Sequence, residues 1–408
     1  MTPKSAVLCM MVLAGCGNPR WNPEGAPLPS QPANNPFIHQ DGPRLVDGNG
    51  ETVSLVGMNL GGWLLWESWV WGGGWQSEKD TLVRFTELLG EDDARAFQER
   101  IRDRFIQEED IAEIARMGFN SVRIPFNHTL LEEDHAPFEY RPEGWAVLDR
   151  ALDWCRQHGI VAVLDLHSAP GGQSWFYMED PDGDSLWDSK EHQERTVALW
   201  KAIAERYADH PAVGGYDLLN EPRPPSGEAL VDLYRRISAA IREVDPRHLI
   251  IVEGGSSASD FSMFTSPITS NQAYSFHMYT WFADPRREEI AKYRAVSQEH
   301  RIPMWNGEFG EESLELETTT AAMYTAPGSG LSGFSFWTWK KVPNGAPCPL
   351  GVTADIPSWN KLINWVARGF NRPTREEALR GIEEFFEATR LANGTLDRDL
   401  LTGLGATP

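Results

Sequence analysis

The chain has 408 residues, of which 41% are hydrophobic and 24% are charged, a composition typical of a soluble globular protein. Its 59 acidic and 37 basic side chains give a formal net charge of −22. This charge repels phosphates and acidic lipid headgroups, so it argues against nucleic acid and against a membrane surface as binding partners. It favours a neutral or cationic ligand.

Residues 1–15 are predicted to be a signal peptide. Lys4 supplies a positive charge, and residues 6–14 form an apolar stretch that is too short to span a bilayer. The run LAGC at residues 13–16 resembles the lipobox of bacterial lipoproteins, which implies that Cys16 is lipidated. We therefore expect a lipoprotein of the bacterial cell envelope, at the outer membrane or cell surface, or otherwise a secreted protein.

The rest of the chain is predicted to contain one tether and one domain. Residues 16–36 are rich in Pro and Asn and have no apolar period, so they are predicted to be a tether from the lipidated cysteine. Residues 37–408 are predicted to form a single domain, and a monomer is expected. Cys155 and Cys348 imply no disulfide framework, and neither has the spacing of a metal site.

Strand-like runs alternate with helical patterns from residue 45 onward. Asp-Gly and Asn-Gly turns at residues 47–50 predict a β-hairpin. Eight runs of strand length then follow, with helical spacing between them. They are residues 55–59, 121–125, 161–167, 213–220, 249–253, 273–279, 304–308 and 333–337.

Eight strands alternating with helices predict an α/β fold, the (β/α)8 TIM barrel. The longest insertion, residues 61–109, follows the first strand and is expected to contain extra helices. Beyond Arg375 we expect one more helix and then a frayed end.

Two glutamates end strand-like runs and are followed at once by residues that stop a strand. Glu221 precedes Pro222, and Glu308 is followed by Phe309 and Gly310. Cleavage of a glycosidic bond needs two carboxyl groups, one to protonate the leaving oxygen and one to attack the anomeric carbon. The pair therefore predicts a glycosidase.

Polar or aromatic side chains stand at most of the other predicted strand ends, where packing alone would favour aliphatic residues. Catalytic groups of a (β/α)8 barrel come from these carboxyl ends of the strands. The candidates, in chain order, are Arg123, Asp165, His167, Asn220, His277, Tyr279, Trp337 and Trp339.

This ordered set resembles glycoside hydrolase family 5, the cellulase family, in which eight positions recur at the active centre. The resemblance covers residues 45–371 and implies a (β/α)8 barrel with a retaining mechanism. It implies Glu221 as acid/base and Glu308 as nucleophile, and no cofactor or metal is expected. The matching residues are Arg123, His167, Asn220, Glu221, His277, Tyr279, Glu308 and Trp337.

The two glutamates need different environments. We expect burial and the charge of Glu308 to raise the pKa of Glu221, so that it stays protonated. Arg123 and the Tyr279 hydroxyl are expected to lower the pKa of Glu308 and to hold its side chain in one rotamer.

The remaining residues of the set are expected to bind sugar or to support the site. Asn220 would bond the sugar 2-hydroxyl, and Trp337 would stack against the ring in the cleavage subsite. His167 and His277 are expected to bind sugar or to orient the residues that do.

A finer resemblance is to the exo-β-1,3-glucanase branch of the family. It rests on residues 59–63 followed by Glu67, and on residues 105–125, 165–173 and 336–340. It implies that Glu67 contacts the sugar and helps to close the non-reducing end of the site. Trp63 and Trp339 belong to these segments and are taken as supporting residues. The departures from the branch are residues 69–75, Met278 and residues 175–187.

The sequence therefore predicts a retaining hydrolase of oligosaccharides or polysaccharides of the β-glucan type, acting as an exo-β-1,3-glucanase or β-glucosidase. An endo-β-1,4-glucanase or mannanase with the same glutamates is an alternative, and the loops at residues 61–109 and 175–188 decide between pocket and open cleft. A carbohydrate-binding lipoprotein without activity would have lost a glutamate, whereas both are present. A metal hydrolase would show paired ligands such as His-x-His, which the sequence lacks.

Overall fold

The computed structural model describes residue 22 and residues 35–181, 183–280, 286–310, 313–343 and 345–407. The predicted signal peptide and Cys16 lie outside these residues, and so does the tether apart from Asn22, Asn35 and Pro36. In the described part of the chain, no helix is both long enough and apolar enough to cross a membrane.

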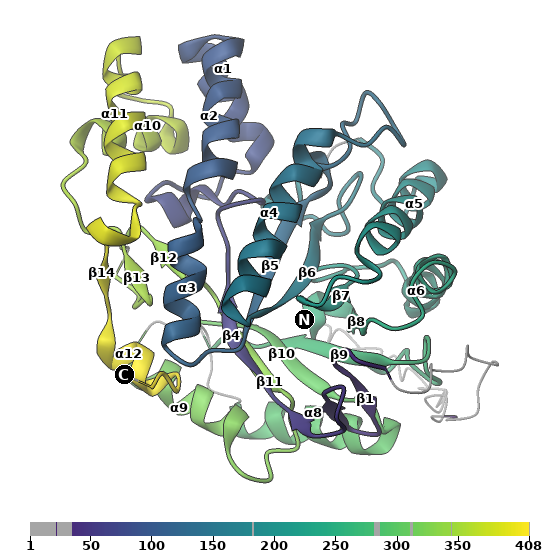
Figure 1. The fold of residues 1–408 in the computed structure, drawn as a ribbon. Coiled ribbons are helices and arrows are strands. Elements are labelled where there is room, and N and C mark those ends of the chain that lie inside the picture. Colours follow the sequence, from purple (N-terminus) through teal and green to yellow (C-terminus); the bar gives the residue numbers. More distant parts are fainter. Residues whose placement is uncertain are drawn as a thin grey trace, which may run out of the picture.

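Eight parallel strands form a closed barrel (Figure 1). All eight predicted strands and the (β/α)8 fold are confirmed. The chain leaves the fourth barrel strand at Asp217, three residues earlier than predicted, and so reaches Glu221 in a loop. The strands are β4 (Leu55–Asn59), β5 (Ser121–Asn127), β6 (Val161–Ser168), β7 (Val213–Asp217), β8 (Ile250–Glu253), β9 (Gln272–His277), β10 (Met304–Phe309) and β11 (Gly333–Phe336).

The helices between the strands cover the outside of the barrel. In α6, for example, apolar side chains at helical spacing are buried, and the Ser226 hydroxyl accepts a hydrogen bond from the Ala229 amide at the N-terminus. These helices are α3 (Glu108–Arg116), α4 (Pro142–His158), α5 (Lys190–Tyr207), α6 (Gly227–Arg242), the short α7 (Gly255–Ala258), α8 (Arg286–His300) and α9 (Leu314–Thr325). A further helix, α10 (Pro357–Arg368), follows the last barrel strand.

The lower half of the barrel interior is apolar. Val163, Ile251 and Trp305 belong to one buried cluster, which the hairpin of β2 (Arg44–Val46) and β3 (Thr52–Val53) contacts through Leu45. The hairpin, which β1 (His39–Asp41) extends, confirms the predicted turn.

The upper half of the interior carries charge. Side chains on a strand alternate, so residues two positions beyond the apolar layer point the same way, one layer closer to the carboxyl ends. On β6 and β8 these residues are Asp165 and Glu253, and both are fully buried. The sequence thus changes from an apolar plug to a charged layer within two residues.

The insertion after β4 and the C-terminal region pack together at one side of the barrel. The insertion holds η1 (Ser68–Trp71), α1 (Glu78–Leu89) and α2 (Glu91–Arg104), and α1 and α2 stand beside α10 and α11 (Arg375–Ala388) (Figure 1). Trp71 lies in edge contact with Trp359, whose ring stacks on Phe385 at 4.0 Å. The insertion is therefore anchored by an aromatic core.

The predicted frayed end is wrong. After α11 the chain forms β14 (Thr395–Leu396) and α12 (Arg398–Gly403), and β14 pairs with β13 (Leu350–Gly351), which pairs in turn with β12 (Lys340–Lys341). Buried Leu400 and Leu401 give α12 an apolar contact surface that the acidic composition of the region hides.

Candidate active site

Arg123 on β5 is the centre of the charged layer and is fully buried. It lies within ion-pair distance of four carboxylates, each from a different strand. The separations are 3.1 Å to Asp165, 2.9 Å to Asp217, 3.0 Å to Glu253 and 2.6 Å to Glu308. One guanidinium cannot neutralise four carboxylates, so some of these groups must bind protons.

Burial favours the protonated forms of Asp165 and Asp217. Burial raises the pKa of Asp165 to about 8 against the opposing charge of Arg123. Burial and the negative charge of Glu253 raise the pKa of Asp217 well above its ordinary value. The charge of Arg123 is therefore balanced mainly by Glu253 and Glu308.

Glu308 ends β10 with both carboxylate oxygens engaged. Oε1 accepts a 2.6 Å hydrogen bond from Arg123 Nη1, and Oε2 accepts one of 2.9 Å from the Tyr279 hydroxyl. The predicted partners of Glu308 are thus confirmed. Gly307 is required here, because a Cβ at that position would come within 2.9 Å of His277 Nε2.

Glu221 faces Glu308 from the loop after β7. Its backbone has a φ of 42°, a left-handed conformation that residues with a Cβ rarely adopt. The amide of Glu221 donates a 2.7 Å hydrogen bond to Glu253 Oε2. Its side chain is 16% exposed, so it can meet a ligand that enters from solvent.

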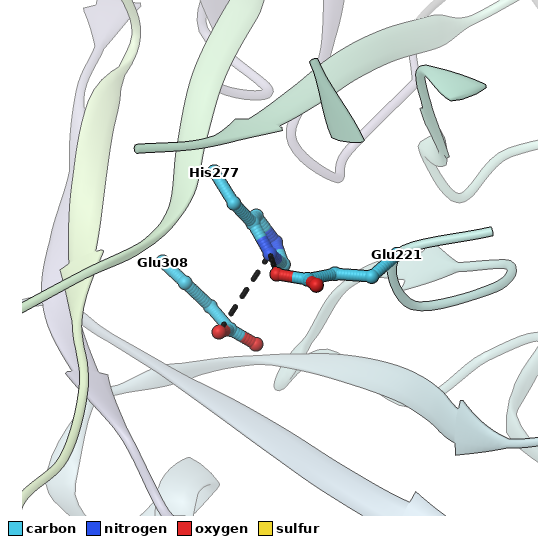
Figure 2. A group of neighbouring side chains, drawn as sticks. All are labelled: Glu221, His277 and Glu308. Carbon is cyan, nitrogen blue, oxygen red and sulfur yellow. Dashed lines mark hydrogen bonds and ion pairs between the residues drawn. The ribbon is translucent and has the colours of Figure 1, made fainter. Parts of the chain in front are cut away.

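His277 stands between the two glutamates (Figure 2). Nδ1 lies 2.8 Å from Glu221 Oε1 and 3.6 Å from Glu308 Oε2, while Nε2 lies 3.1 Å from Glu253 Oε1. Burial alone would lower the pKa of His277, but the charges of Glu253 and Glu308 outweigh it and raise that pKa well above its ordinary value. The charges around His277 therefore favour its protonated form, the imidazolium.

The same three side chains are the group, among the described residues, whose spacing could hold a metal ion, with ligand atoms within 4.8 Å of one another. A histidine that binds a metal ion must present the lone pair of an unprotonated ring nitrogen. Nδ1 of His277 instead hydrogen-bonds to Glu221, and Nε2 lies at ion-pair distance from Glu253, so a carboxylate faces each ring nitrogen. This donor set fits an ion pair better than a metal.

The predicted raised pKa of Glu221 is wrong for this geometry. Burial does act to raise it, but the hydrogen bond and the charge of His277 together outweigh burial, and the pKa of Glu221 is lowered. The proton that Glu221 needs as an acid is held by the Glu221–His277 pair and lies on the imidazole in this geometry.

His167 and Asn220 lie beside the pair, as predicted. Asn220 Oδ1 accepts a hydrogen bond from Arg123 Nη2 at 2.9 Å, and its Nδ2 donates to His167 Nε2 at 3.1 Å. Burial lowers the pKa of His167 to about 4, so its ring is neutral, with Nδ1 bonded to Asp165 at 2.7 Å. The Trp337 ring stacks on His167 with 5.4 Å between centroids.

Glu67 joins the insertion to the loop after β6. Its Oε2 accepts hydrogen bonds of 2.7 Å from both Trp69 Nε1 and the Tyr177 hydroxyl. Burial raises the pKa of Glu67 to about 7, and the negative charges of Glu308 and Glu221 add to the effect.

Two predicted supporting residues lie elsewhere. Trp63 is fully buried and donates its indole N–H to the Arg102 carbonyl, while Trp339 is fully buried and donates to Asp110 Oδ1. Neither side chain is open to a ligand. Both pack in the main hydrophobic core of the protein.

Sequence reasoning missed Glu253, Asp217 and Tyr177. Glu253 carries the signal that identified the other two glutamates, since it ends a strand-like apolar run and is followed by Gly254. Asp217 is hidden inside an apolar run. Tyr177 lies in a loop segment that departs from the exo-β-1,3-glucanase pattern, and only its contact with Glu67 reveals it.

Comparison with known proteins identifies relatives of the chain. The family model of cellulases, glycosyl hydrolase family 5, matches residues 93–342. A β-xylosidase of Phanerodontia chrysosporium is 34% identical over 293 residues, which are 67% of this chain and 61% of that protein. A probable glucan 1,3-β-glucosidase A of Aspergillus fumigatus is 33% identical over 207 residues, 49% of each chain.

The chain thus spans about half to three fifths of the length of these curated relatives. Among solved structures, a β-glucanase from Saccharophagus degradans has a TM-score of 0.54 at 18% identity, covering 90% of this chain and 99% of its own. At that identity the likeness concerns the fold.

Proposed function

Because the chain belongs to glycosyl hydrolase family 5, we propose that it is a retaining glycoside hydrolase that removes sugar units from the non-reducing ends of β-glucans. The observation that carries this proposal is the approach of Glu221 to Glu308, with one oxygen of each and a nitrogen of His277 all within 4.8 Å. Retaining glycosidases have carboxyl groups about 5–5.5 Å apart, whereas inverting enzymes need about 6.5–9.5 Å to admit a water.

In the first step the Glu308 carboxylate attacks the anomeric carbon as the glycosidic C–O bond breaks. The leaving oxygen takes the proton carried by the Glu221–His277 pair. The product is a glycosyl ester of Glu308, and the leaving group departs as an alcohol. Two fixed donors orient Glu308 for this attack, Arg123 on one oxygen and Tyr279 on the other.

In the second step the Glu221–His277 pair has lost its proton, and Glu221 takes a new one from water while the water oxygen attacks the anomeric carbon. The bond to Glu308 breaks, and the sugar leaves with its original β-configuration. Asn220 lies beside Glu221 and is suited to bond the sugar 2-hydroxyl, and Trp337 offers a flat face for the ring.

Exo action is supported by the contacts between the two loops that differ most from the family pattern. Tyr177, in the loop after β6, donates to Glu67 of the insertion. The same loop accepts a 3.2 Å hydrogen bond at Asp180 Oδ1 from the Lys79 amide, and Trp75 packs edge-on against Tyr177. Loops tied together beside the catalytic pair favour a site closed at one end over an open cleft, and so favour the exo reading over an endo-β-1,4-glucanase or mannanase.

A β-xyloside is the second candidate substrate, because a curated relative that matches this chain over 293 residues is named as a β-xylosidase. A xyloside differs from a glucoside only in lacking the hydroxymethyl group at C5, so the same two-step chemistry applies. The N-terminal motif supports an exported protein that is held in the cell envelope through lipidated Cys16.

The anomer released first tests the retaining mechanism. Hydrolysis of an aryl β-glucoside and an aryl β-xyloside, followed by proton NMR within the first minutes, should show the β-anomer of the sugar before mutarotation. The faster of the two substrates identifies the sugar. If the α-anomer comes first, the assignment of Glu308 as nucleophile fails.

A further inference from the structure

We infer that Glu253, at the end of β8, is a positioning residue for the acid/base: it holds the main chain of Glu221 and keeps His277 protonated beside it. The inference rests on the proposed function, since it concerns how Glu221 delivers its proton. It concerns a residue outside the set that the family resemblance supplies.

Glu253 is completely buried, and each of its oxygens contacts Glu221 or a residue that contacts the two glutamates. Oε2 accepts the 2.7 Å hydrogen bond from the Glu221 amide. Oε1 lies 3.0 Å from Arg123 Nη2 and 3.1 Å from His277 Nε2. A single carboxylate thus contacts the backbone of the acid/base, the arginine that binds Glu308, and the imidazole between the two glutamates.

The backbone contact fixes a conformation that Glu221 would not adopt unaided. A φ of 42° is unfavourable for a residue with a Cβ and persists only where the surroundings enforce it. A hydrogen bond from an amide to a buried carboxylate is charge-assisted and stronger than a neutral one. Without this hydrogen bond, the backbone conformation that points the Glu221 side chain at Glu308 is less stable.

The contact between Glu253 and the His277 imidazole stabilises the protonated ring. Three carboxylates face His277: Glu221 from the loop after β7 and Glu308 from β10 on the Nδ1 side, and Glu253 from β8 on the Nε2 side. The positive charge facing Glu253 is Arg123. Glu253 therefore stabilises the second ring proton of His277, which leaves Nδ1–H free to serve Glu221.

Loss of the Glu253 charge should shift the pH dependence of activity in one direction. Removing a negative charge next to an imidazolium lowers its proton affinity, so the Glu221–His277 pair gives up its last proton at a lower pH. The alkaline limb of the pH profile of kcat/KM reports that loss in the free enzyme. A residue that only supports the fold would lower stability without moving this limb.

The test uses the full chain with Glu253→Gln and a matched control, Glu132→Gln. Glu132 is also completely buried and pairs with an arginine, Arg195, at 2.6 Å, but it makes no contact with the catalytic pair. Each protein is assayed for kcat/KM from pH 4 to pH 10 on aryl β-glucosides with a good and a poor leaving group, or on the matching xylosides if these react faster.

Glu253→Gln should shift the alkaline limb of the kcat/KM profile to lower pH by about one unit or more. It should also reduce kcat/KM for the poor leaving group about ten-fold more than for the good one, because only the poor one needs the proton. Glu132→Gln should do neither. A limb and a leaving-group ratio that match those of Glu132→Gln would overturn the inference.

Two further outcomes are covered by the design. If Glu253→Gln does not fold, Glu253→Asp replaces it, because it keeps the charge but moves it back by one methylene. Glu253→Asp should make kcat/KM depend more strongly on the leaving group, as Glu253→Gln would. The inference is overturned if this dependence changes no more than in the control. If the wild-type protein hydrolyses no aryl glycoside, the proposed function fails, which differs from a wild type that is active with an unchanged Glu253 variant.

Discussion

Arg123 and Glu308 are joined by a 2.6 Å hydrogen bond between Nη1 and Oε1, at the bottom of a site where the arginine is fully buried. Since the guanidinium is flat and is held by the carboxyl groups of Asp165, Asp217 and Glu253, it gives Glu308 one orientation. A nucleophile held in this way needs little reorganisation to attack.

Glu308→Gln should therefore abolish turnover and leave the fold intact. The amide has the same size but cannot form the glycosyl ester, so we expect activity below about 0.1% of wild type. Steady-state hydrolysis and the thermal midpoint are measured together, with Glu132→Gln as the control for loss of a buried charge. Substantial residual activity would disprove the nucleophile assignment.

Glu221→Ala should separate the two steps. Activity on glycosides with poor leaving groups is lost for lack of the acid, whereas activated aryl glycosides still form the ester with Glu308. Azide needs no general base, so added azide should partly restore turnover and yield a β-glycosyl azide. If no β-azide forms, the acid/base role of Glu221 is contradicted.

Glu67→Gln should change how stability depends on pH. The pKa of Glu67 is raised to about 7 in the folded protein, so the folded state binds this proton more tightly than the unfolded chain does. The contribution is fully present below the unfolded pKa, near 4.5, and is lost as the pH rises through about 7. For wild type this amounts to about 3 kcal/mol between pH 4 and pH 8.

Gln at this position keeps an oxygen that can accept from Tyr177 and Trp69 but has no proton to lose. Urea unfolding at pH 5 and pH 8 should show a smaller loss of unfolding free energy for Glu67→Gln than for wild type. Glu228→Gln, on an exposed position of α6, is the control. An equal pH dependence in all three proteins would mean that Glu67 is not the titrating group.

The N-terminal prediction has a separate test. Cys16→Ser removes the sulfur that would carry lipid, so the protein should move from the membrane fraction to the soluble exported fraction. Immunoblots of fractionated cells measure this directly, with Cys155→Ser as the control because Cys155 is buried inside α4. Continued membrane association of Cys16→Ser would exclude lipidation as the anchor.

The sequence was sufficient for the barrel and for most of the site, because both follow from short-range patterns. Each strand is a short apolar run, and the carboxyl end of a parallel strand is where a barrel presents its chemistry. That rule located Arg123, His277 and Glu308 directly. It would also have located Glu253 if the fifth strand end had been included.

What the sequence could not supply depends on side-chain contacts between distant segments. The pKa of Glu221 was predicted with the wrong sign because the charge of His277 depends on Glu253, 32 positions beyond Glu221. Trp339 was assigned to the site by analogy with Trp337, yet the backbone leaves β11 at Phe336, so strand alternation no longer applies beyond it. The Tyr177–Glu67 bond joins two loops and has no local signature.

The most direct test of the account is the product pattern over time on laminarin, barley β-glucan, carboxymethyl-cellulose and mannan. If the site is closed at one end beside Glu67, as proposed, monosaccharide should be the sole early product from laminarin, with a slow fall in viscosity. A ladder of oligosaccharides with a rapid fall in viscosity would contradict it and would mean an open cleft with endo action.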